Sequence, residues 1–457
     1  MKLHYRRLVY GIFVLLFLII APSLALYTAG YRFNLSNRSI ERTGAIAIST
    51  EPSEVGVLIN QEKVEQLTPF RLNNILPGEY DIEINTPEYY GWHKKLKVVS
   101  NLTTFLKDLR LIKKQLPTLS SSGNINLLAV PPNSQNLIFS TYDQLSEEKI
   151  LLKEIKKEPV DITGATQTLN GIDFIEFSPH NQEILLGEPG TDDRGFVIVK
   201  ANNGDIENLN TIDKLGFTEL HWDTRNQNLL YGLRRSVLYR LNRAAKTIRP
   251  VLAKDISSYL VSGDDLLYTE NSQNECTLNY FDITDKENKN NENTLDLPGP
   301  CRYNLLPYND SKLILYNLAT GQFFIVDINI LTSNKDEAST ADFRGRADAF
   351  HVNPETGQLL FYNDFEMWAY SPNLNQAELI TRYGQRIDQA EWHPDGQHII
   401  YIVDGNLRAI ELDDRDVRND FVLVGTGTVE RFAQGDNETI YFIGTIGHQK
   451  GLFELEI

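Results

Sequence analysis

One stretch decides the fold, and it reads Glu391-Trp392-His393-Pro394-Asp395-Gly396-Gln397-His398-Ile399-Ile400-Tyr401-Ile402. A short segment ending in Trp392 is joined by Pro-Asp-Gly to an apolar segment rich in β-branched and aromatic residues. This pattern predicts a strand, a tight turn and a second strand. Proline fixes φ and glycine accepts a positive φ, which suits the tip of such a turn. Related stretches recur over three quarters of the chain, so we expect a repetitive architecture.

The recurrence has a regular interval. Eight copies are found, at residues 128–139, 175–186, 220–231, 259–269, 303–316, 350–362, 391–402 and 431–443. They start roughly 40–47 residues apart, close to the period of a four-stranded propeller blade. A further apolar strand such as Phe196–Val199 follows each hairpin. The sequence therefore predicts a mainly β chain with a β-propeller over residues 115–457. We expect eight blades, with seven as the alternative because the copies at 259–269 and 303–316 are weak.

The ends of the predicted propeller indicate how it closes. The last copy finishes at Phe453–Ile457 as a third strand. The segment Leu116–Leu119, which precedes the first copy, is expected to supply the fourth strand of that sheet. Such closure would remove the open sheet edges.

The turns of two copies carry a family resemblance. Phe177-Ser178-Pro179 and Trp392-His393-Pro394-Asp395-Gly396 resemble the TolB-type, PD40-like propeller repeat, which runs aromatic, Ser, Pro, Asp, Gly, apolar. The resemblance implies the propeller fold. It implies nothing about function, because propellers host hydrolases, lyases and plain binding modules.

The N-terminal segment predicts export. Residues 8–26 are apolar and uncharged, and as a helix they are long enough to cross a hydrocarbon core of about 30 Å. Lys2, Arg6 and Arg7 precede them, which places the N-terminus in the cytoplasm. A cleaved signal peptide is the alternative, because Ser23-Leu24-Ala25 resembles a cleavage site. The length of the apolar run favours an uncleaved anchor.

These observations divide the chain as follows. We expect a cytoplasmic tail at 1–7, a transmembrane helix at 8–26, a short polar stalk at 27–43, a small β domain at 44–114 and the propeller at 115–457. The chain would then be a single-pass plasma-membrane protein with an extracytoplasmic body.

The small β domain carries a second resemblance. Its strands and its Leu76-Pro77-Gly78-Glu79-Tyr80 turn are spaced as in the PEGA domain, and the matching positions are Ser49, Thr50, Pro52, Val55, Val57, Ile59, Asn60, Thr68, Pro69, Leu76, Pro77, Gly78 and Tyr80. The namesake motif departs, reading Pro52-Ser53-Glu54-Val55. The resemblance implies a small β-sandwich of surface and envelope proteins, with a binding or spacing role and no known chemistry.

Charge is distributed unevenly along the chain. Residues 1–50 carry a formal charge of +5, residues 51–114 are neutral and the remainder carries −22, which gives the net charge of −17. A strongly acidic body argues against a nucleic-acid partner, which would need a basic surface. It fits a cationic partner or a solvated acidic surface.

Cysteine usage excludes the common thiolate sites. The two cysteines, Cys276 and Cys301, form no C-x-x-C pair, so neither a zinc nor a redox site is expected. In an exported body they are candidates for one disulfide. Two buried free thiols are the alternative.

No motif for catalysis or for a cofactor is present. The sequence lacks a G-x-S-x-G elbow, a G-x-x-x-x-G-K-[ST] phosphate loop and an H-E-x-x-H pair. We therefore predict no enzyme, no catalytic residue, no metal and no cofactor.

Equivalent positions of the repeat supply the candidate binding residues. His221 and His351 fall where other copies have Glu176 and Glu391, and acidic residues stand three positions before three of them, at Asp173, Asp348 and Asp388. First strands surround the central channel of a propeller, so these side chains are expected to form a ring at one mouth. Such a ring would bind a cation or a basic or sugar ligand. The alternative is a set of solvent-exposed residues at strand starts.

The sequence thus predicts a membrane-anchored extracytoplasmic protein that binds or scaffolds a cell-surface glycan or an envelope protein. The alternative is an envelope enzyme, a lyase or a glycan-cleaving protein, with its site in the propeller channel. Carboxylates about 5–10 Å apart in the channel would favour the enzyme.

Overall fold

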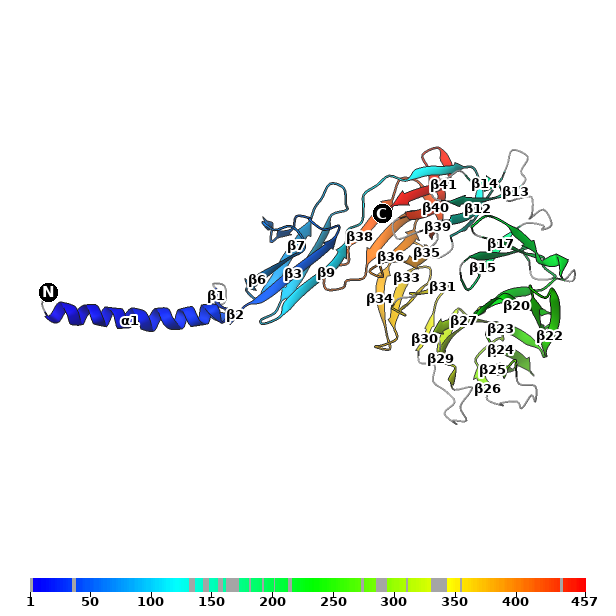
Figure 1. Cartoon of the computed structure of the whole chain (residues 1–457), viewed down its shortest axis with the longest axis horizontal. Coiled ribbons are helices and arrows are strands. Elements are labelled where there is room, and N and C mark those ends of the chain that lie inside the picture. The colour runs from blue at the N-terminus through cyan, green and yellow to red at the C-terminus, as the bar shows by residue number, and fades with distance from the viewer. Residues whose placement is uncertain are drawn as a thin grey trace. The chain divides into compact units, whose positions relative to one another are not determined.

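The chain forms two compact units, the first made of residues 1–115, 410–421 and 457 and the second of 116–409 and 422–456. The structure is a computed structural model, shown in Figure 1. It describes residues 3–34, 38–130, 136–142, 148–154, 159–161, 172–180, 182–190, 193–200, 202–212, 216–272, 275–284, 294–309, 311–329, 343–353, 356–435 and 439–457. The predicted first turn, at 131–135, lies outside these residues.

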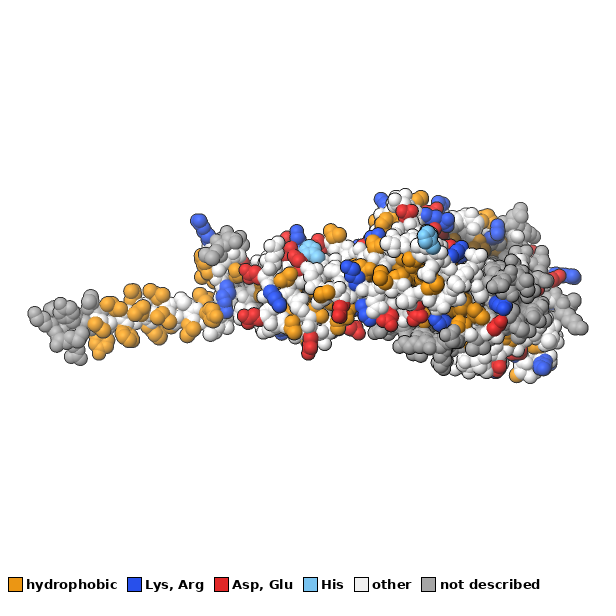
Figure 2. Space-filling view, turned by 90° about the horizontal axis from the view of Figure 1, so that it is seen from above, with side chains coloured by type: hydrophobic (Ala, Val, Ile, Leu, Met, Phe, Trp, Pro, Cys, Tyr) orange, Lys and Arg blue, Asp and Glu red, His pale blue; other side chains and the backbone are white. Residues whose placement is uncertain are grey.

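The first unit begins with the apolar helix α1, Leu3–Thr28. Its segment Val9–Thr28 has a mean hydropathy of 2.6 and none of it is buried by the rest of the protein. Hydrophobic side chains cover the face of the helix seen in Figure 2. By length and composition this segment is a candidate membrane span or signal sequence.

A short hairpin follows the helix where the sequence predicts a polar stalk. Strands β1 (Tyr31–Asn34) and β2 (Ser39–Arg42) pair antiparallel. Side chains alternate along these two strands, so the hairpin has two faces of different polarity. A stalk predicted from composition alone does not include this hairpin.

The small β domain consists of two sheets. The first has the order β6-β3-β9, with β9 parallel to β3, and the second has the order β5-β4-β7-β8. Residues alternate between buried and exposed along β8, and Ile46, Ile82, Trp92 and Leu96 are almost fully buried. The strands are β3 (Gly44–Glu51), β4 (Leu58–Ile59), β5 (Glu62–Lys63), β6 (Phe70–Ile75), β7 (Gly78–Ile84), β8 (Trp92–Val98) and β9 (Thr103–Arg110).

A buried ion pair belongs to the same unit. Lys94 is completely buried and its ammonium group pairs with the carboxylate of Glu411, in the segment 410–421. The other oxygen of Glu411 accepts a hydrogen bond of 2.8 Å from the indole of Trp92. A buried cation without such a partner would cost several kcal/mol, so both groups depend on each other.

The second unit contains eight four-stranded sheets in the described part of the chain. Seven are built from four consecutive strands and the eighth from β39, β40, β41 and β10. The first four sheets contain β11 (Ile125–Ala129), β12 (Asn136–Tyr142), β13 (Glu148–Glu154), β14 (Val160–Asp161); β15 (Asp173–Phe177), β16 (Glu183–Gly187), β17 (Phe196–Lys200), β18 (Ile206–Asn208); β19 (Glu219–Asp223), β20 (Asn226–Arg234), β21 (Val237–Asn242), β22 (Thr247–Ala253); β23 (Ile256–Ser262), β24 (Asp265–Ser272), β25 (Glu275–Asp282) and β26 (Thr294–Leu297).

The remaining sheets contain β27 (Tyr303–Asn309), β28 (Lys312–Asn317), β29 (Gln322–Asp327), β30 (Phe343–Arg346); β31 (Ala349–Val352), β32 (Leu359–Tyr362), β33 (Glu366–Ser371), β34 (Gln376–Arg382); β35 (Ile387–Trp392), β36 (His398–Val403), β37 (Asn406–Glu411), β38 (Asp420–Val424); and β39 (Thr428–Gln434), β40 (Thr439–Ile446), β41 (Gln449–Glu456), β10 (Thr118–Ser122). A short 3-10 helix, η2 (Leu209–Thr211), follows β18.

The sheets follow one another around the unit in chain order, as the colours of Figure 1 show. First strands of successive sheets contact each other at β11·β15, β19·β23, β23·β27, β31·β35, β35·β39 and, closing the circle, β11·β39. The prediction of an eight-bladed propeller is therefore confirmed. The alternative of seven blades is wrong, because the weak copies at 259–269 and 303–316 each form the first two strands of a sheet.

The eighth sheet joins the two ends of the propeller sequence. Strand β10 pairs antiparallel with β41, from Thr118 opposite Glu454 to Ser122 opposite Gly451. The predicted closing strand lay slightly earlier, at Leu116–Leu119. Phe139 of the first sheet packs in one apolar cluster with Tyr441 and Leu452 of the eighth, so side chains as well as backbone groups hold the closure.

A disulfide connects the fourth and fifth sheets. Cys276 of β25 is bonded to Cys301, which lies just before β27. Both residues belong to an apolar cluster with Leu278 and Tyr303. The structure therefore shows the pair that the sequence offered as a candidate.

The closure gives a test of the fold. A Cβ atom at Gly451 would lie 2.1 Å from the carbonyl oxygen of Ser121, whereas one at Gly384 would meet nothing within 4 Å. We expect Gly451→Ala to lower the free energy of unfolding by about 1–3 kcal/mol through overpacking. Gly384→Ala is the matched control and should change it by less than about 0.5 kcal/mol. Thermal and denaturant unfolding, followed by circular dichroism, measure both. Equal stabilities would contradict the closure.

Candidate functional site on the first strands of the propeller

The seven predicted ring residues all lie on, or directly before, first strands. Strand β15 carries two of them, β19 one, β31 one with another just before it, and β35 two. In this order they are Asp173 and Glu176, His221, His351 and Asp348, and Asp388 and Glu391. The structure does not join them into one cluster. It brings five of them together in two groups, and Asp173 and His351 belong to neither.

The first group links β15 to β19. Nδ1 of His221 lies 3.1 Å from Oε2 of Glu176, and the backbone N–H of Trp222 donates to the other carboxylate oxygen. The imidazole is 41% exposed and the carboxylate 30% exposed, so both remain open to a ligand. The ring of Tyr259 on β23 stands edge-on to the imidazole, with 5.7 Å between centroids. Three first strands thus contribute to one polar site.

Glu219 also belongs to this group, although it was not among the predicted ring residues. It stands two residues before His221 on β19, so the two side chains point to the same side of the strand. Burial raises the pKa of Glu219, and the nearby His221 and Arg194 offset part of that rise. The signal that would have found it is the alternation Glu219-Leu220-His221-Trp222.

The environment also changes the titration of His221. Burial disfavours the charged imidazolium, but the hydrogen bond and the charge of Glu176 outweigh burial and raise the pKa of His221 above 6.5. The pKa of the buried Tyr259 hydroxyl is raised well above its usual value by burial and by the charges of Glu219 and Glu176. The group therefore favours the charged imidazolium form of His221 and the neutral phenol form of Tyr259.

The second group surrounds Tyr362 of β32. Burial raises the pKa of this tyrosine, and the negative charges of Glu391, Asp348 and Asp388 raise it further. Neighbouring side chains already engage two of these carboxylates. Asp388 lies 3.7 Å from the guanidinium of Arg386, and Glu391 accepts hydrogen bonds from amide groups of neighbouring residues, as described next.

Glu391 belongs to an amide network between β35 and β39. It accepts hydrogen bonds of 2.7 Å from Gln389 and 3.3 Å from Gln434. Gln389 also pairs through its amide with both the N–H and the carbonyl of Phe432. The network aligns two first strands, so Glu391 has a structural role that its acidity alone did not reveal.

The other two predicted residues have simpler surroundings. Asp173 is 61% exposed and lies 3.8 Å from the guanidinium of Arg194. The carbonyl oxygen of His351 accepts a hydrogen bond of 2.9 Å from the indole of Trp392. A shared mouth for Asp173, Asp348 and Asp388 stays a prediction.

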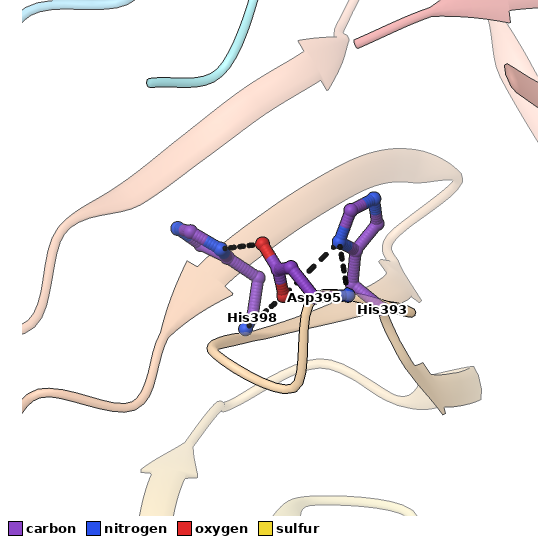
Figure 3. Close-up of side chains that lie close together, drawn as sticks. All are labelled: His393, Asp395 and His398. Carbon is purple, nitrogen blue, oxygen red and sulfur yellow. Dashed lines mark hydrogen bonds and ion pairs between the residues drawn. The ribbon is translucent and has the colours of Figure 1, made fainter. Parts of the chain in front are cut away.

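A buried histidine–aspartate cluster lies in the turn between β35 and β36 (Figure 3). Asp395 accepts hydrogen bonds from the backbone N–H groups of Gln397 (2.8 Å) and His398 (3.1 Å). Its carboxylate oxygens also lie 2.7 Å from Nδ1 of His398 and 3.1 Å from Nδ1 of His393. Burial would raise the pKa of Asp395, but the two imidazoles hold it well below the usual range.

These three residues are one of two sets in the described chain whose ligand atoms lie close enough together to hold a metal ion; Asp81, Glu83 and His93 of the small domain are the other. Imidazole nitrogen and carboxylate oxygen suit zinc and similar ions. The bonds of Asp395 to its own turn, however, fully account for its position. Gly396 has φ of +66° and donates to the carbonyl of His393, so the Pro-Asp-Gly segment is a hairpin turn as predicted.

A cavity of about 320 Å³ lies away from the first strands. Its charged lining includes Arg243, whose guanidinium forms hydrogen bonds of 2.7 Å to Glu183 and 2.6 Å to Glu207. These two carboxylates hold the guanidinium between strands of neighbouring sheets. We therefore assign this cluster to stability.

Comparisons with known proteins leave the family open. No protein-family model matches the sequence, and no curated protein matches it. The chain is similar to a solved eukaryotic initiation factor at 11% identity and a TM-score of 0.47, covering 75% of this chain and 91% of that one.

It is also similar to a chain of a mitotic checkpoint complex, at 12% identity and a TM-score of 0.41 over 76% and 98% of the two chains. Dipeptidyl peptidase 4 of Porphyromonas gingivalis matches at 11% identity and a TM-score of 0.46, over 72% of this chain and 56% of that one. All three TM-scores are below 0.5, so we base no argument on these likenesses.

The Glu176–His221 pair predicts a specific titration. In two-dimensional NMR of the imidazole carbons, His221 should titrate above 6.5, and Glu176→Gln should lower its pKa because the carboxylate charge is lost. The matched control Asp205→Asn, which removes an exposed carboxylate that lies off the first strands, should leave it unchanged. Because the folded pKa is raised, the pair stabilises the fold below about pH 6.5, and this contribution is lost as pH rises through the folded pKa. An unshifted His221 in the Glu176 variant would contradict the pairing.

The Asp395 cluster predicts an acid-dependent stability. We expect Asp395→Asn to destabilise the fold by about 1–3 kcal/mol at pH 7, because charge-assisted hydrogen bonds to buried groups are lost. The pKa of Asp395 is lowered in the folded state, so this contribution is present above its ordinary value of 3.8 and fades as pH falls below it. Thermal unfolding between pH 3 and 7 measures it, with the exposed Asp296→Asn as control. A difference independent of pH would contradict this role of Asp395.

Proposed function

We propose that the chain is a membrane-anchored, extracytoplasmic binding protein whose propeller holds a cationic segment of a partner protein on its first strands. The observation that carries the proposal is the group Glu176, Glu219 and His221, in which two first strands place two carboxyl groups and an imidazole at one half-exposed site beside the buried ring of Tyr259. Carboxylates in such surroundings attract positive charge. Residues 115–457 also carry a formal charge of −22, which attracts positive charge as well.

The anchor is part of the proposal. Residues 1–7 would stay in the cytoplasm, residues 8–26 would cross the plasma membrane once, and the chain from residue 27 onward would lie outside. Three observations support this placement: the basic residues before the apolar run, the length of Val9–Thr28 and the disulfide between Cys276 and Cys301.

We propose further that residues 44–114 are a PEGA-like spacer and that the propeller is of the TolB type. Support for the first comes from the two small sheets and the turn between β6 and β7 at the Leu-Pro-Gly-Glu-Tyr position. Support for the second comes from the Ser178 and Asp395 turns, in which each side chain accepts a hydrogen bond from the backbone of its own turn.

A second candidate function is favoured by one observation. A carboxyl group whose pKa is raised, such as Glu219, is what a general acid requires, and the carboxylate of Glu176 acts on the same imidazole, His221. The chain would then be an envelope enzyme, a lyase or a glycan-cleaving protein. Product formation from surface glycans that disappears in Glu219→Gln would favour this function over binding.

Binding is tested with a fluorescent Lys- and Arg-rich peptide and the full chain in detergent. We expect Glu176→Gln with Glu219→Gln to raise Kd about tenfold or more, equivalent to about 1.4 kcal/mol. The control Asp205→Asn removes a 62% exposed carboxylate that lies off the first strands, and it should leave Kd unchanged. An equal increase in Kd in the double variant and in Asp205→Asn would show that general surface charge attracts the peptide. Binding of a neutral glycan instead of the peptide would reject a cationic protein partner.

A further inference from the structure

The hairpin β1–β2 has two faces of opposite character. Tyr31 is paired with Arg42 and Phe33 with Ile40, so these four side chains share one face. Phe33 and Ile40 are each 56% exposed. Phe33 and Ile40 therefore place two large apolar side chains next to each other on the exposed face of a small hairpin.

The other face of the hairpin is polar and satisfied internally. Asn34 is almost fully buried and donates a hydrogen bond of 3.0 Å to Glu41, which also accepts one of 2.6 Å from Ser39. Glu41 is the one acidic residue among the first fifty. The hairpin therefore turns its polar groups inward and its apolar pair outward, the reverse of a hairpin that faces water.

Hydrogen bonds hold the hairpin at the end of helix α1. The carbonyl of Gly30 accepts bonds from both the backbone N–H and the hydroxyl of Thr43, so the chain returns to where it left the helix. The guanidinium of Arg32 donates 2.8 Å to the carbonyl of Tyr27 and lies 3.6 Å from the centre of its ring. The hairpin cannot move away from the helix end without breaking these contacts.

The exposed face also carries positive charge. Arg38 at the turn and Arg42 at the end of β2 are both exposed, and the guanidinium of Arg42 lies 5.1 Å from the ring centre of Tyr31. Figure 2 shows basic side chains beside hydrophobic ones where the helix meets the rest of the first unit. Tyrosine together with arginine beside an apolar segment is the composition of a membrane interface.

The length of the helix fixes the depth. The span Val9–Thr28 has 20 residues, which as a helix cover about 30 Å, the thickness of the hydrocarbon core. Tyr31 follows three residues later, in the interfacial layer roughly 5–8 Å thick on each side. In this position the apolar pair would lie near the boundary between acyl chains and headgroups.

We propose that the face Tyr31, Phe33, Ile40 and Arg42 is a second membrane contact, which inserts Phe33 and Ile40 beneath the headgroups while Arg38 and Arg42 bind lipid phosphates. The inference rests on the proposed membrane anchor. It adds that the first residues after the span lie in the bilayer surface and do not form a free stalk. The ligand is the phosphate-bearing lipid surface.

Spin labels on single cysteines test this in the full chain. The two native cysteines are bonded to each other, so an introduced cysteine is the one free thiol. Labels are placed at Ile40→Cys, at Leu16→Cys within the span, and at Leu374→Cys, a 69% exposed control on the propeller. The protein is reconstituted in vesicles of phosphatidylcholine and phosphatidylglycerol, at roughly 3:1. Accessibility to oxygen, which enters lipid, and to a water-soluble nickel chelate is measured by power saturation.

The expected result is a several-fold lower nickel accessibility at position 40 than at 374, with high oxygen accessibility. Two outcomes overturn the inference while the anchor stands, each with the label at 16 inside the bilayer. In one, position 40 is as accessible to nickel as 374; in the other, position 40 excludes both reagents, as it would under a covering protein. Exposure of the label at 16 to nickel would instead overturn the anchor, and the inference with it.

A charge variant provides the second measurement. Arg38→Gln with Arg42→Gln leaves Phe33 and Ile40 in place, so loss of folding is not expected. The label at 40 should become several-fold more accessible to nickel in vesicles that contain phosphatidylglycerol. An unchanged depth would show that phosphate binding by these arginines does not hold the hairpin at the surface.

Discussion

The pairing of β10 with β41 is the constraint on which the propeller depends. Among the described strands, the other seven sheets of the second unit are each made of consecutive strands, whereas this sheet joins residues from both ends of the repeat. Without it, the eighth sheet would have three strands and the backbone groups of β41 that face β10 would lose their partners. The apolar cluster around Phe139 and Tyr441 joins the first and eighth sheets independently of β10.

The same circle explains how the candidate site arises. Glu176 and His221 are 45 residues apart in the chain, about one repeat, and they meet because equivalent positions on successive first strands become neighbours. The repeat therefore converts a sequence period into a spatial contact, as helical periodicity does for residues four apart. The chemistry then depends on which side chain each copy carries, and at this place Glu219 adds a carboxyl group and Tyr259 an aromatic ring.

Much of the fold was predictable, and less of the site was. Turn residues and apolar alternation are local signals, so even weak copies at 259–269 and 303–316 identified strands. The site depends on contacts across sheets. Sequence position gave the Glu176–His221 pair, but it did not show that Gln389 and Gln434 engage Glu391 or that Arg194 lies beside Asp173. The hairpin turn at Pro394–Gly396 was predicted correctly, but the burial of His393 and His398 beside Asp395 was not predicted, because it depends on packing against residues distant in the sequence. Residues 27–43 were predicted as a stalk from composition, because four-residue strands are too short for alternation to stand out.

The position of β10 in the chain also determines when the propeller can close during synthesis. Strand β10 is made early, and its partner β41 begins about 330 residues later in the chain. At synthesis rates of roughly 5–20 residues per second, β10 waits on the order of 15–70 s for it. If the chain emerges across a membrane behind its N-terminal helix, seven sheets are present before the circle can shut. During that interval β10 has no partner strand, and its backbone N–H and C=O groups can pair with a strand of another chain.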